Sequence, residues 1–395
     1  MKIGLYAQPS RSVLGGTDVC VAVLASGLAA SHQVEILHHG SVVTIDDLAE
    51  FTGTDLAGVR LRRIAPLSLE TSESYNPLRR YQQARNAGRH WSAGYDLFVA
   101  FVHDPPPFCH ARRGILRVLF PMFTPYHRTP ACSGNSRMWD RARRAYASVE
   151  WRRRIGSYTT VVAISAYTRN WVQRLWGTDA AILYPPAGAD VMPGDKSSLV
   201  LSVGRFTAGG HVKCQLELVG AFAGLDLPGW RYVLAGALGS SPGDQAYAAR
   251  VREAAANKPI TVAPNLDRAA VRDLYGHAKI FWHAAGLSNT DDVPYLNEHF
   301  GISTVEAMAA GCVPVVINKG GQPEIVEHGV NGFLWNTVDE LSRYTCLLAS
   351  DDALWCRMSR AAIERARRFD RAHYLDGFLR LLGLPSPGKR GSEAP

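Results

Sequence analysis

The chain has 395 residues, more than one hydrophobic core usually supports, so we expect two domains of nearly equal size. Its apolar share of 47% and charged share of 20% are ordinary for a globular protein, and we expect neither a transmembrane helix nor a signal peptide. Seven scattered cysteines, none in a C-x-x-C pair, argue against a disulfide framework and a zinc site. Together these features favour a protein of the reducing cytoplasm.

The net charge of +8 reflects an uneven distribution of arginine. The clustered arginines are Arg112, Arg113, Arg117, Arg137, Arg141, Arg143, Arg144, Arg152, Arg153 and Arg154. Such a cluster attracts anionic partners, although a solvated helix face is the commoner explanation. Nucleic acid is disfavoured because the arginines lack interleaved exposed aromatic residues and a recognised module. Peripheral contact with an anionic membrane at its inner face therefore stays a hypothesis.

The first half of the chain alternates short apolar runs with helical segments. Residues 2–7 are predicted to form a strand, Gly15 and Gly16 a loop and residues 19–29 a helix, which is the first unit of a doubly wound sheet. Further strands are predicted at 33–39, 59–64, 96–101, 114–120, 159–165 and 180–186, and helices at 77–91, in the arginine-rich segment and at 166–175. This alternation implies parallel strands, whose C-terminal ends form the functional edge.

Two features of the first half lie at such an edge. Gly15 and Gly16 would let the backbone approach a phosphate or a sugar closely, although a simple turn explains the pair equally well. His103 follows the strand at 96–101 directly and is a candidate acceptor-side base or hydrogen-bonding group. A loop histidine is more often solvated, so both interpretations of His103 stay open.

A passage rich in proline and glycine over 185–194 predicts a linker, which gives domains at 1–193 and 194–368. Just beyond it, Arg205 ends a strand predicted at 198–206, and Lys213 opens a helix over 214–225. These two cations suit a diphosphate, because a guanidinium binds two oxygens at once and an ammonium adds point charge. An ion pair of Arg205 with a neighbour is the structural alternative. No Walker loop and no intact G-x-G-x-x-G are present.

The alternation continues to the end of the second half. Strands are predicted at 230–237, 260–265 and 279–286, and helices at 245–257, 267–278, 337–350, 351–369 and 371–384. Asp291 and Asp292 are interpreted as a solvated loop, because a metal site needs more ligands. The polar tail over 385–395 is predicted to be disordered.

The run from His299 to Asn318 carries one charge within its apolar stretch, that of Glu306. Ile302, Val305 and Ala309 recur at helical spacing and predict a largely buried helix, with Gly311 just past its end. Glu306 should therefore meet a hydrogen-bond donor, since a buried unpaired carboxylate is costly. Ser303 or Thr304 is expected to cap the first turn, and the free amides of residues 301–304 make a seat for an anion. With Glu298 at its mouth, this pattern fits a phosphorylated polyol; a core helix with salt-bridged glutamates is the alternative.

Glu298 and Glu306 form an E-x7-E pair, which the sequence GGQPEIVEHGVNGFL follows from Gly320. In these residues the chain resembles the retaining GT-B glycosyltransferases of family four, the glycogen-synthase-like group. The segments ISAYT at 164–168 and LYPP at 183–186 are similar to that family as well. The resemblance implies two Rossmann-like domains, and a last helix over 369–384 that braces the first domain across the interdomain cleft. It also implies transfer of a sugar from a nucleotide diphosphate donor to a hydroxyl, without a metal or other cofactor.

By this resemblance, Glu298 would bind the transferred sugar, Glu306 the ribose, and Arg205 with Lys213 the diphosphate. The further donor-binding residues that it implies are Gly15, Gly16, Asn265, Leu266, Phe300, Gly301, Ile302 and Ser303. The family's histidine in the pattern H-[FY]-P is replaced by Leu119, so its role falls to His103, to His127 or to no residue.

Two other functions stay open on the sequence. A GT-B epimerase or phosphorylase would use the same cleft with free phosphate, water or a bound intermediate. A non-catalytic protein that binds a sugar nucleotide would account for Leu119 in place of histidine. The donor sugar, its base, the acceptor (a glycan, a lipid-linked or a small molecule) and the oligomeric state are not readable from these residues.

Overall fold

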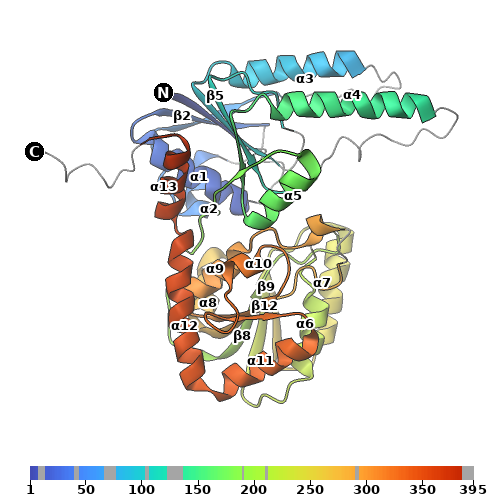
Figure 1. Cartoon of the computed structure of the whole chain (residues 1–395). Helices are drawn as coiled ribbons and strands as arrows, with labels where there is room; N and C mark the ends of the chain where they lie inside the picture. Colours follow the sequence, from blue (N-terminus) through green and yellow to red (C-terminus); the bar gives the residue numbers. More distant parts are fainter. Residues whose placement is uncertain are drawn as a thin grey trace, which may run out of the picture. The chain divides into compact units, whose positions relative to one another are not determined.

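The structure is a computed structural model that describes residues 1–7, 14–39, 44–65, 77–102, 106–121, 137–188, 191–209, 212–289 and 293–384. It divides into two units, Met1–Leu183 and Tyr184–Pro395, each with its own parallel sheet (Figure 1). The linker predicted from the sequence puts the domain boundary after residue 193, within the proline- and glycine-containing passage that follows Tyr184. In the described part of the chain, no helix has both the length and the apolar character to cross a membrane.

The first unit contains a seven-stranded sheet in the order β3-β2-β1-β4-β5-β6-β7, with parallel pairing between all neighbours. Its strands are β1 (Lys2–Ala7), β2 (Gln33–His38), β3 (Val59–Arg63), β4 (Leu97–Val102), β5 (Arg113–Val118), β6 (Thr160–Ala163) and β7 (Ala181–Ile182). Its helices are α1 (Gly16–Ala29), α2 (Ile45–Thr52), α3 (Pro77–Ser92), α4 (Arg137–Ile155) and α5 (Ala166–Trp176). The strand order reverses beside β1, as in a doubly wound sheet.

The second unit contains a six-stranded parallel sheet in the order β10-β9-β8-β11-β12-β13. Its strands are β8 (Ser197–Val203), β9 (Arg231–Gly236), β10 (Ile260–Pro264), β11 (Ala278–His283), β12 (Val313–Ile317) and β13 (Phe333–Trp335). Its helices are α6 (Gln215–Ala223), α7 (Pro242–Ala255), α8 (Arg268–His277), α9 (Ile302–Ala309), α10 (Gln322–Ile325), α11 (Val338–Ser350), α12 (Asp352–Ala366) and α13 (Arg371–Leu381), with short 3₁₀ turns η1 (Pro294–Leu296) and η2 (Arg367–Phe369). The expected pair of doubly wound sheets is confirmed.

Sequence reasoning missed two helices, α2 and α10. A signal for α2 was present, because the side chain of Thr44 accepts a hydrogen bond from the amide of Asp47, and the carboxylate of Asp47 accepts one from the amide of Thr44. The four-residue α10 carries too few residues for a helical period to be recognised.

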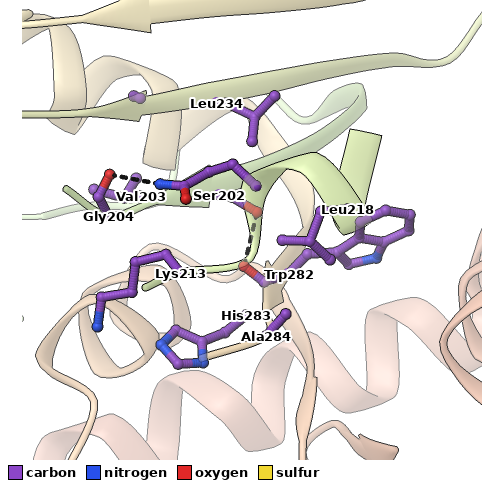
Figure 2. Close-up of a pocket in the computed structure, with 11 residues that line it drawn as sticks. Ser202, Val203, Gly204, Lys213, Leu218, Leu234, Trp282, His283 and Ala284 are labelled. Carbon is purple, nitrogen blue, oxygen red and sulfur yellow. Dashed lines mark hydrogen bonds between the residues drawn. The ribbon is translucent and has the colours of Figure 1, made fainter. Parts of the chain in front are cut away.

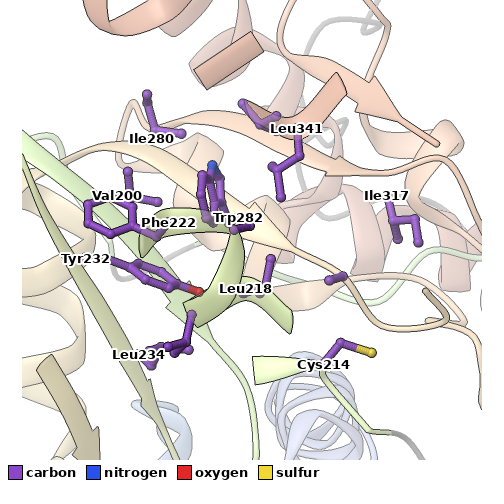
Figure 3. Close-up of a cluster of buried hydrophobic side chains, with 14 of the residues drawn as sticks. Val200, Cys214, Leu218, Phe222, Tyr232, Leu234, Ile280, Trp282, Ile317 and Leu341 are labelled. Atoms are coloured by element: carbon purple, nitrogen blue, oxygen red, sulfur yellow. The ribbon is translucent and has the colours of Figure 1, made fainter. Parts of the chain in front are cut away.

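Trp282 lies at the centre of the second unit's core, in a cluster that includes Phe222 and Tyr232 (Figure 3). It is fully buried, and its indole N–H donates to Thr345 Oγ1 at 3.0 Å. Its carbonyl oxygen accepts a hydrogen bond of 2.9 Å from the hydroxyl of Ser202 on β8. These contacts fix the C-terminal end of β11, and the next residue along the chain is His283.

Candidate functional site

Three polar side chains meet near the C-terminal ends of β8 and β11. Lys213 Nζ lies 2.6 Å from Glu298 Oε2, and His283 Nε2 lies 2.9 Å from the same oxygen. The side chains of Lys213 and Glu298 are 19% and 20% exposed, and that of His283 is 3% exposed. We call these three residues the Glu298 cluster; all of them belong to the second unit.

Each member of the Glu298 cluster comes from a different segment. His283 ends β11, and because side chains alternate along a strand, it points to the face opposite Trp282. Lys213 lies between β8 and α6, with its stem against Gly204, where an added Cβ would lie 2.8 Å from Lys213 Cγ. Lys213 and His283 both line the pocket that is drawn in Figure 2.

A pair of glycines fixes the backbone of Glu298. The amide of Gly321 donates to the Glu298 carbonyl oxygen at 2.8 Å. Gly320 has φ of +64°, and a Cβ at this position would lie 2.1 Å from the same carbonyl oxygen. Only glycine combines this backbone conformation with so close an approach. Gly320 and Gly321 of the motif therefore fix the backbone position of Glu298.

The charges of the Glu298 cluster follow from burial and pairing. Desolvation raises the pKa of Glu298, but the Lys213 charge and the His283 hydrogen bond outweigh it and hold this pKa well below its usual range. Desolvation lowers the pKa of His283, and the hydrogen bond to Glu298 offsets this only in part. At neutral pH the cluster therefore holds a carboxylate, an ammonium and a neutral imidazole.

Helix α9 begins beside this cluster, and its cap differs from the expected one. The N-cap residue is Gly301, with φ of +122°, and no side chain caps the helix. The expectation that Ser303 or Thr304 caps the first turn is wrong, because α9 starts at Ile302 and both residues lie within it. The predicted end is confirmed, since Gly311 follows the C-cap with φ of +81°.

Two fully buried side chains at the start of α9 have polar atoms without a hydrogen-bond partner in the described part of the chain. They are the hydroxyl of Thr304 and both amide atoms of Gln322. Gln322 lies against the N-cap, where a Cβ on Gly301 would be 2.7 Å from its Nε2. Buried polar atoms of this kind are rare because each costs about 1–3 kcal/mol.

Glu306 lies within α9, about one turn after Ile302, and has the hydrogen-bond donor that was expected from the sequence. The hydroxyl of Tyr275 donates to Glu306 Oε2 at 3.1 Å. Burial, followed by the Glu306 charge, raises the pKa of Tyr275 well above its ordinary value, so the phenol keeps its proton. Glu306 itself is half-buried.

The remaining candidates of the second unit occupy its C-terminal strand edge. Arg205 is exposed. The pKa of Asp244 is lowered mainly by a hydrogen bond from Ser241, and the charge of Arg205 makes the smallest contribution. Asn265 has φ of +57°, and its Oδ1 accepts from the Leu238 amide at 2.8 Å. The neighbouring Leu266 is 38% exposed.

Phe300, the residue before the N-cap of α9, is 2% exposed. Its ring stacks on that of Tyr184, with the ring centroids 5.5 Å apart. The ring of Phe369 contacts Phe300 at 5.3 Å in an edge arrangement. Phe300 therefore anchors the segment between Glu298 and α9, and its side chain is occupied by aromatic neighbours.

The candidates of the first unit are only partly described. Gly15 caps α1 with open space where a side chain would be, but its amide already donates to Asp18 at 2.7 Å, and Gly16 begins the helix. Leu119 is buried, with 6% exposure. His103 and His127 lie outside the described residues, as do Asp291 and Asp292. Within the described ranges, no three His, Cys, Asp or Glu side chains gather as a metal ion would require.

Two family models match the chain in succession. "Glycosyltransferase Family 4" matches residues 14–190, and "Glycosyl transferases group 1" matches residues 191–369. The chain belongs to the family 4 glycosyltransferases. Their two matched segments cover most of both units, and the parallel sheets of these units have the GT-B fold.

Solved structures of this fold are similar to the chain over nearly its whole length. Anabaena Alr3699/HepE in complex with UDP gives a TM-score of 0.68 at 18% identity, over 97% of this chain and 100% of that one. Sucrose-phosphate synthase from Thermosynechococcus elongatus gives 0.66 at 17% identity, over 97% and 98%. At these identities the likeness establishes the fold alone.

Curated relatives match over shorter stretches. The GDP-Man:Man(3)GlcNAc(2)-PP-Dol alpha-1,2-mannosyltransferase of Dictyostelium discoideum is 26% identical over 256 residues, which are 58% of this chain and 48% of that protein. The D-inositol 3-phosphate glycosyltransferase of Streptomyces avermitilis is 39% identical over 79 residues, 20% of this chain and 17% of the relative. The chain thus spans half or less of the length of these relatives.

Sequence reasoning brought Glu298 and Lys213 to one region but missed His283. A strand that ends in histidine at a functional edge was a signal for it, since His283 closes the run KIFWH. The pairing of Lys213 with Glu298 was also not foreseen, because Lys213 was assigned to the diphosphate alone. The two partners are 85 positions apart in the sequence, so no local pattern connects them.

We expect the neutral state of His283 to make stability depend on pH. Below the ordinary histidine pKa of about 6.5, the unfolded chain binds a proton at this residue that the folded chain does not bind until its lowered pKa is reached. Folding is therefore opposed as the pH falls. The variant His283→Gln lacks this proton but keeps an N–H group toward Glu298.

Urea unfolding at several pH values between about 5 and 7 measures this difference. The free energy of unfolding should fall more steeply with decreasing pH in the natural chain than in the His283→Gln variant. Other histidines contribute equally to both proteins and cancel in the comparison. Equal slopes would mean that His283 is not held neutral by the fold.

Proposed function

We propose that the chain is a retaining glycosyltransferase that moves a sugar from a nucleotide diphosphate sugar to an acceptor hydroxyl. The observation that carries this proposal is the Glu298 cluster beside the uncapped N-terminus of α9. A carboxylate is an acceptor for sugar hydroxyls, and a helix N-terminus binds phosphate. Membership of the family 4 glycosyltransferases supports the same reaction class.

In this proposal the donor diphosphate lies at the N-terminus of α9. The free amides of residues 301–304 and the helix dipole favour an anion there. The unpartnered amide of Gln322 and hydroxyl of Thr304 lie at the same end of the helix and could donate to the phosphate oxygens. Arg205 and Lys213 supply positive charge, which matters most as the diphosphate leaves.

The sugar and the ribose are assigned to the two glutamates. Glu298 Oε2 is occupied by Lys213 and His283, whereas Oε1 has no partner among the described residues and is the proposed acceptor for a sugar hydroxyl. Glu306, held by Tyr275, is proposed to bind the ribose hydroxyls. Gly15 and Gly16 are proposed to approach the donor, and Asn265 with Leu266 to lie beside the base.

The proposed reaction breaks the bond between the anomeric carbon and the β-phosphate oxygen. The acceptor oxygen forms the new bond to that carbon on the same face, and its proton passes to the leaving phosphate oxygen. Sugar configuration is thereby retained, and no metal or cofactor is required. The proposal leaves His103 and His127 as candidates for orienting the acceptor hydroxyl.

The first experiment identifies the donor. A true ligand stabilises the folded state according to its affinity, so a thermal-shift panel of UDP, GDP, ADP and TDP with their sugars should single out one nucleotide. UDP occurs in the similar Anabaena structure and GDP-mannose in the name of the Dictyostelium relative, so both bases belong in the panel. A phosphorylase or epimerase would release no nucleoside diphosphate in an acceptor-dependent way.

With that donor, Glu298→Gln should lower transfer at least 100-fold and leave binding of the nucleoside diphosphate measurable. The amide keeps the shape of the side chain but replaces the charged acceptor for the sugar hydroxyl, and removing one preorganised contact costs about 2.7–4 kcal/mol of barrier. Release of nucleoside diphosphate in the presence of acceptor measures the rate. Glu306→Gln is the matched control, and it should weaken nucleotide binding itself.

Unchanged turnover in Glu298→Gln would refute the catalytic assignment. Binding of sugar nucleotide without turnover in the natural chain, over a broad acceptor panel, would instead favour the non-catalytic alternative. Product analysis by NMR then reports the configuration at the anomeric carbon. An inverted product would contradict retention while leaving the transferase assignment intact.

An anionic membrane surface is the proposed partner of the first unit. Helices α3 and α4 lie side by side (Figure 1), and Arg153 of α4 donates to the hydroxyl of Tyr81 on α3. The exposed arginines of these helices in the described part are Arg79, Arg85, Arg89, Arg152 and Arg153. Leu78 is 70% exposed beside them. Basic charge with exposed apolar residues suits peripheral binding to anionic lipid.

Sedimentation with vesicles tests this surface. Vesicles of phosphatidylcholine that contain about a third phosphatidylglycerol, an anionic lipid, should bind the chain in low salt and release it in high salt. Replacing Arg85, Arg89 and Arg152 by serine should weaken binding roughly 100-fold, at about 1 kcal/mol per charge. Equal binding to pure phosphatidylcholine, or no binding, would remove the membrane partner.

A further inference from the structure

His283 is a buried member of the Glu298 cluster to which the proposed reaction assigns no task. Its side chain is 3% exposed, and its Nε2 lies 2.9 Å from Glu298 Oε2. Its other ring nitrogen, Nδ1, is buried without a hydrogen-bond partner in the part of the chain that the structure describes. A side chain so placed acts on the substrate through Glu298 or has no part in binding it.

The partners of His283 determine where its proton lies. The carboxylate of Glu298 is ionised and can only accept, so Nε2 must carry the hydrogen of this contact. A second proton on Nδ1 would be a buried donor without an acceptor, and it would add a charge near the ammonium of Lys213. The neutral ring with hydrogen on Nε2 is therefore the form that the geometry supports.

Glu298 thus receives two donors on one oxygen. Lys213 and His283 both bond Oε2, at 2.6 and 2.9 Å, and they approach from the segments after β8 and at the end of β11. Oε1 has no partner among the described residues. Two hydrogen bonds to the same oxygen fix the rotation of the carboxylate and leave the other oxygen for a ligand.

The two donors differ in rigidity. The lysine ammonium is a point charge at the end of a flexible four-carbon stem, so by itself it tolerates several carboxylate orientations. The imidazole has two side-chain torsions, and its backbone follows Trp282, which is locked in the core by Thr345 and Ser202. Precise placement of a binding group requires support of this second kind.

We propose that His283 is the positioning residue for the transferred sugar: its Nε2–H holds Glu298 Oε2 so that Oε1 faces the sugar hydroxyls. This inference rests on the proposed transferase function and adds to it a determinant of sugar binding as distinct from nucleotide binding. Loss of the Nε2–H contact should therefore impair the sugar nucleotide and spare the nucleoside diphosphate.

Two variants that differ by one methylene group test this proposal. In His283→Gln the amide nitrogen reaches the place of Nε2, whereas in His283→Asn the shorter amide does not. We expect His283→Asn to lower kcat/KM for transfer and the affinity for the sugar nucleotide by about 10- to 100-fold, the range for a hydrogen bond to a charged group. The affinity for the nucleoside diphosphate should change less than about threefold, well below that range.

His283→Gln should recover most of both losses, and circular dichroism checks that both variants are folded. Titration calorimetry with the sugar nucleotide and with the nucleoside diphosphate separates the two affinities. Equal weakening of both ligands, or a His283→Gln variant as impaired as His283→Asn, would overturn the proposal.

An independent readout does not require activity. In ¹⁵N NMR of the histidine rings, with His283→Gln used to assign the signal, His283 should appear as the neutral ring with hydrogen on Nε2 at pH 7. A charged ring, or hydrogen on Nδ1, would overturn the positioning role. If the natural chain transfers no sugar, the proposed function fails, and this spectrum still decides the state of His283.

Discussion

The candidate site depends on one largely buried negative charge that its surroundings must keep ionised. Desolvation alone would raise the pKa of Glu298, and only the nearby ammonium of Lys213 and the N–H of His283 reverse that effect. An unpaired charge in such surroundings costs several kcal/mol, so the ionised state of Glu298 depends on these two donors. Around this charge the fold brings together the ends of β8 and β11 and the segment before α9.

The same interaction joins the proposed sugar and diphosphate subsites. Lys213 is paired with the carboxylate proposed to bind the sugar, although the residue was expected at the diphosphate. An ammonium has three N–H groups, so it can bond Glu298 and a phosphate oxygen at once. Binding of the sugar and binding of the diphosphate would then be coupled through Lys213. Transfer of the sugar away from Glu298 would change the contacts of Lys213 with the diphosphate that leaves.

The sequence predicted the arrangement of strands and helices well because the signals are local. Apolar runs and helical periods each lie within one element, Gly311 directly follows one, and the two parallel sheets follow from the alternation of strands and helices. The short α10 and the uncapped start of α9 depend on how the Gly320 segment packs on Glu298. Such contacts join residues that are distant along the chain, so no pattern in the sequence reveals them.

The residues of the candidate site likewise fall into those that a local pattern predicts and those that depend on tertiary contacts. Glu298, Glu306 and Lys213 stand in recognisable motifs, whereas His283 acquires its role only through a hydrogen bond to Glu298. The partners of Lys213 likewise depend on tertiary packing. The two glutamates were therefore predictable as candidate site residues, and their electrostatic environment was not.

A double-mutant cycle on transfer tests the coupling of Lys213 and Glu298 most directly. It compares kcat/KM of the natural chain with those of Lys213→Met, Glu298→Gln and the variant that carries both changes. If the two residues act as one unit, the double variant should be little worse than the poorer single variant, with a coupling energy of about 1–3 kcal/mol. Losses that simply multiply would contradict a shared role for the pair.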